Sequence, residues 1–262
     1  MKKILSLFLA AIMVTLTLAS CSGGKPDIEE VRPRIVELIE ASYEINDIFF
    51  GDGLDRVDYE AEYQKIIDSY APALEAAEKK LAEAKANYDA LLAAGASEDA
   101  LTAVKQEIEN AEKEVNKNTY MFTKEEFIAL YDTDSTYIAV VSDKYLTVED
   151  IKTAAEQVYS ASYLMSVYET TFVGYADSGL TDMIYARYYN GTDGLMILKE
   201  ADIWVTEKRV YDYDSMTIVR PSNGKKITVK IDSHLEGSDE TLAVRLSFVK
   251  QNGEWFLDSP TY

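Results

Sequence analysis

Apolar residues recur at every third or fourth position from Asp27 onward. This spacing places one apolar stripe along a helix, which is the pattern of an amphipathic helix packed against a core. Pro33 fits only the first turn of that helix, because no backbone hydrogen bond is lost there. Gly51 and Gly53 end the pattern, since glycine tolerates positive φ. The stripe comprises Val31, Ile35, Leu38, Ile39, Ser42, Ile45 and Phe49.

Residues 72–117 consist almost entirely of alanine, glutamate, lysine, leucine and other strong helix formers. Two apolar stripes flank Gly95, which can end a first helix, and Ser97, which can cap a second. This arrangement predicts an antiparallel helical hairpin with arms of about twenty residues, or ~30 Å at 1.5 Å per residue. The alanine-rich seam predicts close, coiled-coil-like packing. The stripes are Leu74, Ala77, Leu81, Ala84, Tyr88 and Leu91, then Leu101, Val104, Ile108, Ala111 and Val115.

Two further helix starts follow the hairpin region. The sequence Thr-Lys-Glu-Glu at 123–126 has the spacing of a capping box and predicts a short helix. Thr147, with Asp150 three residues later, precedes a broadly apolar helical pattern over 151–168, which predicts one long helix. Between them, the apolar run 137–141 is strand-like.

Alternation of apolar and polar residues replaces the helical spacing from Asp182 to the end of the sequence. It is clearest over 226–231 and 241–248, where one face is expected in the core and the other in water. We predict an antiparallel sheet of four to six strands. Helices followed by hairpins indicate an α+β fold, with the helices packed on one face of a curved sheet. The turn dipeptides between the strands are Asn190-Gly191, Asp193-Gly194, Asn223-Gly224 and Asn252-Gly253.

The first twenty residues have the order of a secretory signal peptide, with Lys2 and Lys3, an apolar stretch over 4–18 and small residues before Cys21. The apolar stretch is shorter than the ~20 residues that span a bilayer as a helix, so a retained transmembrane anchor is the weaker interpretation. Residues 18–21 (Leu-Ala-Ser-Cys) resemble the lipobox of bacterial lipoproteins. The resemblance implies that the Cys21 thiol receives a diacylglyceryl group and becomes the mature N-terminus. The alternative is a buried free cysteine that follows a signal peptide.

These features predict the organisation and the address of the protein. Residues 1–20 form a lipoprotein signal peptide, and 21–26 form a lipidated, flexible tether. A single α+β domain spans 27–262, with 72–117 inserted as the helical hairpin. The protein is predicted to be exported and lipid-anchored to the outer face of the bacterial cytoplasmic membrane, because two acyl chains are enough for stable anchoring.

Composition excludes several classes of function. The 262 residues include 26 Lys+Arg and 46 Asp+Glu, for a formal charge of −20, and 47% are hydrophobic, as in folded proteins. An acidic chain without basic clusters is unsuited to nucleic acid, and it is repelled by an anionic bilayer, which leaves the lipid as the membrane contact. One cysteine and one histidine exclude an internal disulfide, cysteine-based metal clusters and motifs that need two imidazoles. No cofactor or metal is predicted.

Three resemblances to known families concern the folded part. Helices before a sheet that ends in 253–260 (Gly-Glu-Trp-Phe-Leu-Asp-Ser-Pro) resemble the layout of the nuclear transport factor 2-like fold, which implies a pocket between helix and sheet. The stretch 137–159 is similar to the IseA-type extracellular inhibitors of cell-wall DL-endopeptidases. Residues 45–54 (Ile-Asn-Asp-Ile-Phe-Phe-Gly-Asp-Gly-Leu) are similar to a segment of uncharacterised lipoproteins of gut-type Gram-positive bacteria. That resemblance implies no established activity and places the hairpin as an insertion after Leu54.

Candidate chemistry is sparse. Asp232, Ser233 and His234 are neighbours on one predicted strand, where adjacent side chains point to opposite faces, so they do not build a catalytic triad. A surface histidine is the favoured interpretation. The acidic runs 132–135 and 212–215 resemble the opening of a calcium loop, but neither continues to the required glycine and distal glutamate.

Carboxylates and aromatic residues leave alternatives open. Two carboxylates suffice for glycoside hydrolysis, and 46 acidic residues neither exclude nor nominate a pair. The 19 tyrosines offer faces that bind glycans or proteins, although ordinary strand positions are favoured for those in the sheet region. Trp204 and Trp255 either line a pocket or lie in the core, which is the commoner location. The tyrosines in question are Tyr185, Tyr188, Tyr189, Tyr211 and Tyr213.

The leading hypothesis is a noncatalytic surface lipoprotein. It acts as a binding or inhibitory module that engages another envelope component, a protein or peptidoglycan, through the helical hairpin and a concavity of the sheet. One alternative is a carboxylate-dependent cell-wall hydrolase, which a clustered pair of buried acids in the concavity would favour. The other is a small-ligand carrier, which would have a closed apolar pocket.

Overall fold

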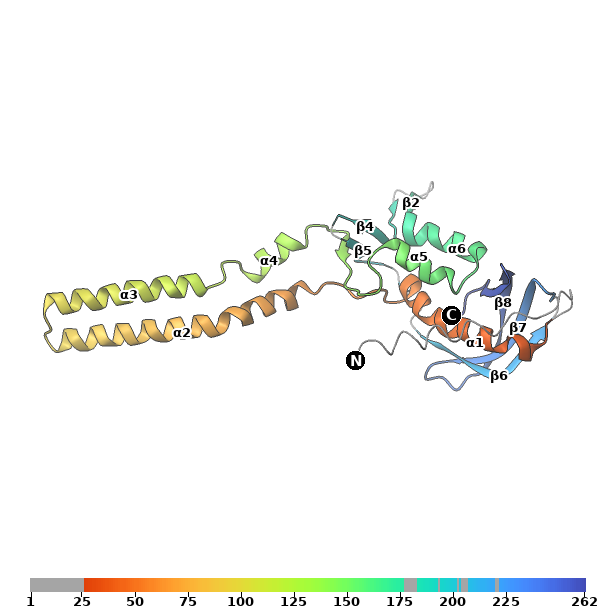
Figure 1. Ribbon diagram of the computed structural model, residues 1–262, viewed down its shortest axis with the longest axis horizontal. Helices are drawn as coiled ribbons and strands as arrows, with labels where there is room; N and C mark the ends of the chain where they lie inside the picture. The colour runs from red at the N-terminus through yellow and green to blue at the C-terminus, as the bar shows by residue number, and fades with distance from the viewer. Residues whose placement is uncertain (1–25, 177–182, 193, 202, 204–206, 220–221) are drawn as a thin grey trace, which may run out of the picture. The chain divides into compact units, whose positions relative to one another are not determined.

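The computed structural model describes residues 26–176, 183–192, 194–201, 203, 207–219 and 222–262. It confirms the predicted α+β class (Figure 1). The chain divides into two compact units, which are described separately below. The sheet unit comprises the described parts of 26–54, 144–190 and 201–262, and the hairpin unit comprises those of 55–143 and 191–200.

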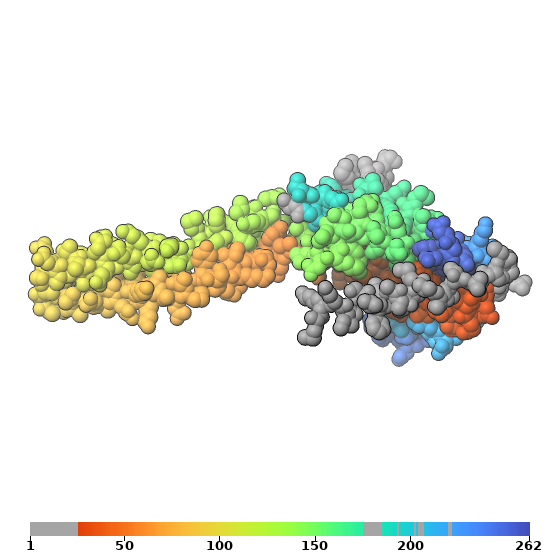
Figure 2. Space-filling view, viewed as in Figure 1, coloured from red at the N-terminus to blue at the C-terminus, as the bar shows by residue number. Residues whose placement is uncertain are grey.

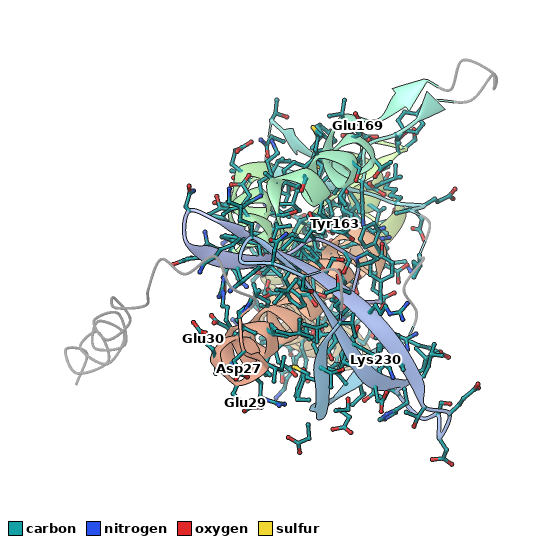
Figure 3. The ribbon with its side chains drawn as sticks, turned by 90° about the vertical axis from the view of Figure 1, so that its right-hand side faces the viewer. Asp27, Glu29, Glu30, Tyr163, Glu169 and Lys230 are labelled. Carbon is teal, nitrogen blue, oxygen red and sulfur yellow. The ribbon has the colours of Figure 1, made fainter. Side chains whose placement is uncertain are left out.

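Helix α1 (Ile28–Phe50) opens the sheet unit. The Asp27 carboxylate caps it by accepting a hydrogen bond from the Glu29 backbone amide at 3.0 Å, and Figure 3 shows both residues beside Glu30 at this end of the helix. Every residue of the predicted apolar stripe is buried, which confirms the predicted helix. The predicted place of Pro33 is wrong, because α1 begins at Ile28 and Pro33 lies beyond its first turn. Burial of the stripe on both sides outweighs the one lost backbone hydrogen bond.

The largest described sheet is antiparallel, with the order β6-β7-β8-β9. α1 packs on it through contacts with β6 and β9. On β7 the predicted alternation is confirmed, since Ile227, Val229 and Ile231 are all buried. The predicted hairpin turn at Asn252-Gly253 is also confirmed, because both residues have the positive φ of a type I′ turn. The strands are β6 (Arg209–Val219), β7 (Lys226–Leu235), β8 (Leu242–Gln251) and β9 (Glu254–Leu257).

The long helix predicted over 151–168 is broken in the structure. α5 (Val148–Glu156) begins at Thr147 with the predicted capping box, and α6 (Ala161–Tyr168) follows as a separate helix. Between them the chain pairs with β9: the Leu257 amide donates to the Val158 carbonyl at 3.0 Å, and the Ser160 amide donates to the Leu257 carbonyl at 2.7 Å. Val158, Tyr159 and Ser160 at the break stay buried, so the apolar pattern did not reveal it. A π-helical turn, η1 (Glu169–Val173), and the short strands β2 (Tyr175–Ala176) and β3 (Met183–Ile184) complete this region.

The hairpin unit is built on α2 (Tyr59–Ala93) and α3 (Glu98–Asn118), which run antiparallel as predicted (Figures 1 and 2). Gly95, at a φ of 68°, closes α2, and the Ala96 amide donates to the Leu91 carbonyl at 3.0 Å as in a Schellman motif. Ser97 caps α3 by accepting a hydrogen bond from the Ala100 amide. Both glycine and cap therefore act as predicted.

The first arm of the hairpin begins at Tyr59 rather than near residue 72. Asp58 caps α2 by accepting a hydrogen bond from the Ala61 amide at 2.9 Å, and Pro72 lies inside the helix. The 35 residues of α2 span about 52 Å at 1.5 Å per residue. The early part of α2 carries tyrosines in place of the alanine-rich composition, which is why composition did not predict it.

The rest of the hairpin unit contains a short helix and a pair of short strands. α4 (Lys124–Tyr131) begins with the predicted capping box and packs against α2. β1 (Tyr137–Ala139) confirms the strand-like run and pairs antiparallel with β5 (Gly194–Leu198). The strand β4 (Tyr188–Gly191) belongs to the sheet unit except for Gly191. The contacts within the chain define two compact units, and the single domain over 27–262 stays a prediction.

Candidate functional site

Aromatic rings gather in the hairpin unit where the first part of α2 meets the segment before α4. The centroids of Tyr70 and Tyr120 are 5.6 Å apart, and Tyr63 lies 6.1 Å from Tyr120 and 5.6 Å from Phe127. Phe122 contacts Tyr120 at 5.8 Å. We define the aromatic patch as Tyr63, Tyr70, Tyr120, Met121, Phe122, Phe127 and Tyr131.

Most of the aromatic patch faces water. The exposed fraction is 85% for Met121, 55% for Tyr131 and 40% for Phe122. Phe127 is buried and contacts Tyr131 at 4.7 Å, so it anchors the patch to the unit. A contiguous exposed group of large apolar side chains is characteristic of an interaction surface, whereas single exposed residues are ordinary.

Local hydrogen bonds hold the aromatic patch in place. In the capping box of α4, the Thr123 amide donates to the Glu126 carboxylate at 2.8 Å, and the Glu126 amide donates to the Thr123 hydroxyl at 3.2 Å. The Tyr63 hydroxyl donates to the Phe122 carbonyl at 3.3 Å and ties α2 to the same segment. The rings therefore project from a fixed framework, which lowers the entropy lost when a partner binds.

Charged groups near the aromatic patch are predominantly acidic. Lys124 pairs with Glu60 at 3.3 Å and Lys65 pairs with Glu62 at 2.5 Å, so these two lysines are already neutralised. Asp68 accepts a hydrogen bond from the uncharged Gln64 side-chain amide at 2.8 Å. Residues 59–131 contain 15 acidic and 8 basic residues, a net charge of −7. The apolar surface therefore lies in a negative potential.

In the sheet unit, the segment 45–54 forms the end of α1. The Asp47 carbonyl accepts hydrogen bonds from the amides of Gly51 at 2.9 Å and Gly53 at 3.1 Å. A Cβ on Gly51 would lie 2.2 Å from a carboxylate oxygen of Asp47, and Gly53 has a φ of 83°. Both glycines are required by the turn.

A buried arginine closes the same end of α1. Arg187 donates from Nε to the Ile48 carbonyl at 2.9 Å and also bonds the Gly51 carbonyl. The Tyr188 hydroxyl donates to the Ile48 carbonyl at 3.1 Å and accepts from the Leu54 amide at 3.1 Å. These groups satisfy carbonyls that every helix leaves free at its C-terminus. The segment 45–54 therefore has a structural role.

A buried polar network joins α1 to the last residues of the sheet unit. Tyr159 donates to Asn46 Oδ1 at 2.6 Å, Asn46 Nδ2 donates to Thr261 Oγ1 at 2.7 Å, and Ser42 Oγ lies 2.7 Å from the same Thr261 oxygen. Tyr211 donates to the Thr261 carbonyl at 2.8 Å. Burial raises the pKa of Tyr159 to about 12. Among the described residues, no buried side-chain nitrogen or oxygen lacks a partner, so the network is saturated.

A recess of about 470 Å³ opens beside this network in the sheet unit. Its lining mixes the carboxylates Asp47 and Asp52 with the cations Lys208 and Arg209. Partial burial raises the pKa of Asp47, yet both aspartates are exposed to solvent. In the part of the chain that the structure describes, no aspartate or glutamate is buried. The buried acid pair that would favour a hydrolase is thus missing from these residues.

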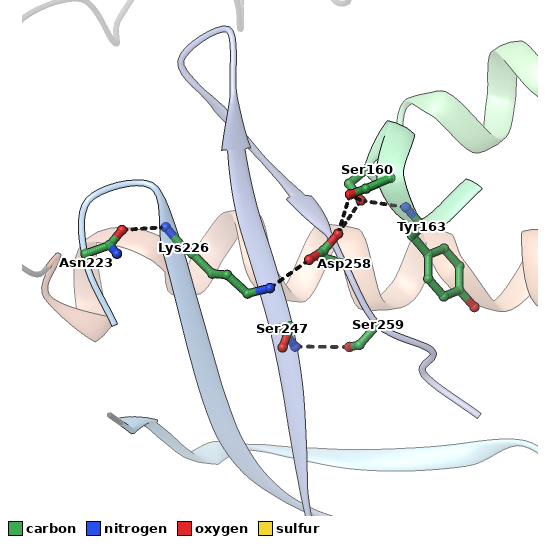
Figure 4. A network of polar contacts seen from close by, with 8 residues as sticks. Ser160, Tyr163, Asn223, Lys226, Ser247, Asp258 and Ser259 are labelled. Atoms are coloured by element: carbon green, nitrogen blue, oxygen red, sulfur yellow. Dashed lines mark hydrogen bonds and ion pairs between the residues drawn. The ribbon is translucent and has the colours of Figure 1, made fainter. Parts of the chain in front are cut away.

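Asp258 organises a second polar cluster of the sheet unit (Figure 4). Its carboxylate accepts hydrogen bonds from Ser160 at 2.6 Å and Ser162 at 2.8 Å, and Lys226 pairs with it at 3.0 Å. Partial burial acts to raise the pKa of Asp258, but hydrogen bonds from Ser160, Lys226 and Ser162 outweigh it and hold that pKa below its ordinary value. The Ser160 hydroxyl also caps α6 by accepting from the Tyr163 amide at 3.2 Å. The cluster fixes the start of α6 against β9.

The structure does not bring the candidate catalytic and calcium-binding residues of the sequence analysis together as a catalytic site. Ser233 is buried and accepts from Arg209 Nη1 at 3.2 Å, whereas His234 is half-buried and pairs with Val210 in the sheet. Asp132 pairs with Lys199 at 2.8 Å. The described residues contain no group of three or more histidine, cysteine, aspartate or glutamate side chains placed to hold a metal.

Most of the described aromatic residues of the sheet region occupy the strand or core positions that the sequence favoured. Tyr188, Tyr211 and Trp255 are buried in the sheet unit. Tyr185 is 49% exposed. Trp204, named as a pocket residue, and Cys21, named as the lipidation site, lie outside the residues that the structure describes.

Sequence reasoning did not find the aromatic patch. The available signal was the spacing of Tyr63 and Tyr70, which puts them on one face of a helix, together with the run Tyr120-Met121-Phe122.

Comparison with protein-family models gives no match, and comparison with curated protein sequences gives none either. None of the described helices is long and apolar enough to cross a membrane.

Proposed function

We propose that the protein is a noncatalytic, lipid-anchored binding module of the cell envelope, and that its hairpin unit is the docking arm. The observation that carries the proposal is the aromatic patch, an exposed and rigidly held group of rings on an otherwise polar helical hairpin. Large aromatic side chains supply most of the binding energy of protein interfaces. An export signal and a lipidated Cys21, both predicted from sequence, would place this arm outside the cytoplasmic membrane.

The polar side chains of the sheet unit support this division of roles. The groups around Thr261, Asp258 and Arg187 are engaged in hydrogen bonds within the unit. They stabilise the fold and offer no free nucleophile or base. The resemblances to the nuclear transport factor 2-like fold, to the IseA-type inhibitors and to uncharacterised Gram-positive lipoproteins stay predictions, and an inhibitory role is compatible with the proposed binding function.

Capture from an envelope extract tests the proposal. The bait is the chain from Ser22 to Tyr262, which keeps every described residue. A patch variant combines Tyr70→Ser, Met121→Ser and Phe122→Ser. A matched control combines Met165→Ser and Leu242→Ser, two residues of the sheet unit with exposed fractions of 69% and 56%. We expect the control to retain a protein partner that the patch variant loses.

A second variant separates the outer hairpin from the aromatic patch. Replacing 78–118 with a short Gly/Ser linker removes the outer part of α2 and all of α3, and it connects the retained part of α2 to Thr119, next to Tyr120, whose ring lies 5.6 Å from that of Tyr70. Retention of the partner by this variant would assign binding to the patch itself. Peptidoglycan serves as a second bait. Glycan bound equally by all variants, without a protein partner, would contradict the docking arm.

A further inference from the structure

We infer that the aromatic patch binds a basic protein segment, whose arginine or lysine side chains lie on the exposed ring faces and pair with neighbouring carboxylates. The inference rests on the proposed function, because it names the chemistry of the partner for the same surface. The face of an aromatic ring carries negative charge density and attracts cations. Arginine also stacks on such faces through its planar guanidinium group.

The geometry of the aromatic patch leaves ring faces available. Contacting rings are tilted by 47° to 62°, so none of these pairs stacks face to face. Elsewhere in the hairpin unit, Lys105 Nζ already lies 5.7 Å from the centroid of Tyr88. Within the described residues, none of the cation–ring contacts involves a ring of the patch. The faces are therefore not occupied by a cation of the same chain.

Charge distinguishes a basic segment from other occupants. Residues 59–131 carry a net charge of −7, which attracts a basic segment and repels an anionic polymer. The same charge repels a second copy of the hairpin unit. The Asp68 carboxylate is exposed on α2 and available to pair with an incoming cation, whereas the exposed Glu62 carboxylate pairs with Lys65 and would exchange that partner for the incoming cation. A neutral glycan would use the rings, and its hydroxyls would donate hydrogen bonds to carboxylates, but it would gain nothing from the net charge.

The test measures binding of fluorescein-labelled decaarginine to the chain from Ser22 to Tyr262 by fluorescence anisotropy. Decaglutamate and chitotetraose are the comparison ligands, each measured at low and at physiological salt. A ring variant, Tyr70→Leu with Tyr120→Leu, keeps the apolar bulk and removes the ring faces. A second ring variant, Phe122→Leu with Tyr131→Leu, changes only exposed rings and guards against loss of folding, which far-ultraviolet circular dichroism checks.

Carboxylate variants separate local pairing from general attraction. Glu62→Gln with Asp68→Asn removes two charges near the patch. Glu98→Gln with Asp99→Asn removes two charges at the first turn of α3, beside the turn of the hairpin. We expect each ring variant to weaken decaarginine binding by about three- to tenfold, in line with cation–ring energies. We expect the patch carboxylate variant to weaken it several-fold more than the α3 variant does.

Three results would overturn the inference. The first is decaarginine binding that both folded ring variants retain in full. The second is an equal loss in the two carboxylate variants, which would mean unspecific attraction to an acidic protein. The third is ring-dependent binding of chitotetraose in place of decaarginine. If envelope capture still depends on the patch in any of these cases, the proposed docking function stands and the chemistry of its partner is different.

Discussion

The Tyr159 hydroxyl is one of the few buried titratable groups of the sheet unit. It donates to Asn46 Oδ1, and Asn46 in turn donates to Thr261, so one phenol supports a chain of buried bonds. The ring also stacks on Tyr163, with centroids 4.6 Å apart. The residue was recognised from sequence as part of an apolar helical pattern, but its polar partners lie 113 and 102 positions away and could not be inferred from spacing.

Ionisation of Tyr159 should destabilise the sheet unit at alkaline pH. Its folded pKa of about 12 exceeds the unfolded value of about 10, so its contribution is complete below pH ~10 and is lost as pH rises toward 12. Tyr159→Phe keeps the ring but removes the titrating group. We would measure the free energy of unfolding by urea between pH 9 and 12. It should fall with rising pH less steeply in the variant than in the wild type, by up to about 1.4 kcal/mol per pH unit. Identical slopes would show that Tyr159 ionises equally in both states.

Asp258 should stabilise the protein with the opposite pH dependence. Its folded pKa lies below the ordinary value, so its contribution is present above the unfolded pKa of about 3.9 and is lost as pH falls through the folded pKa. Asp258→Asn should cost about 1–2 kcal/mol at pH 7, because hydrogen bonds to a charged group are weakened. The difference between wild type and variant should shrink when urea unfolding is repeated near pH 2.5. A constant difference at both pH values would rule out this role for the charge.

At the scale of elements, helix caps were predicted well and helix lengths were not. Thr123, Thr147 and Ser97 cap the helices that their local sequences indicate, because capping depends on residues three positions apart. The break after α5 depends on pairing with Leu257, a contact far along the chain. Pro33 was likewise placed in a first turn by its local preference, and the hairpin was started near residue 72 by composition, but both α1 and α2 begin upstream of these prolines.

Pro72 should be a weak point of α2. It is exposed, and it cannot donate the backbone hydrogen bond that the Asp68 carbonyl would otherwise receive. Pro72→Ala should stabilise α2 by about 1–3 kcal/mol, since alanine restores the donor and has the best helix propensity. Amide hydrogen exchange along α2 measures this change. The exposed control Ala86→Gly should lower protection by about 1 kcal/mol, and reduced protection in Pro72→Ala would contradict the prediction.

At the scale of the molecule, the fold class and the hairpin were predictable because both are encoded in periodicity. The aromatic patch was not, since its rings come from segments about 50 residues apart that only the hairpin brings together. The buried polar network depends on similarly distant contacts. The lipid anchor is a prediction from the sequence around Cys21 alone.

Loss of the lipid should free the protein from the membrane. We expect Cys21→Ser to move the protein from the membrane fraction to the soluble fraction, because two acyl chains supply the anchoring energy. Ser22→Ala serves as the neighbouring control and should leave the distribution unchanged. Fractionation followed by immunodetection measures both. Full membrane retention of Cys21→Ser would refute anchoring through this residue.

If the aromatic patch is the docking surface, site-specific photo-crosslinking in cells will capture the partner there. Met121, which is 85% exposed, would be replaced by p-benzoylphenylalanine, and the same probe would be placed separately at Leu242 in the sheet unit. We expect a crosslink to a discrete envelope protein from position 121 that disappears when Tyr70→Leu and Tyr120→Leu are added. A crosslink only from position 242, or one from position 121 that survives removal of both rings, would contradict this expectation.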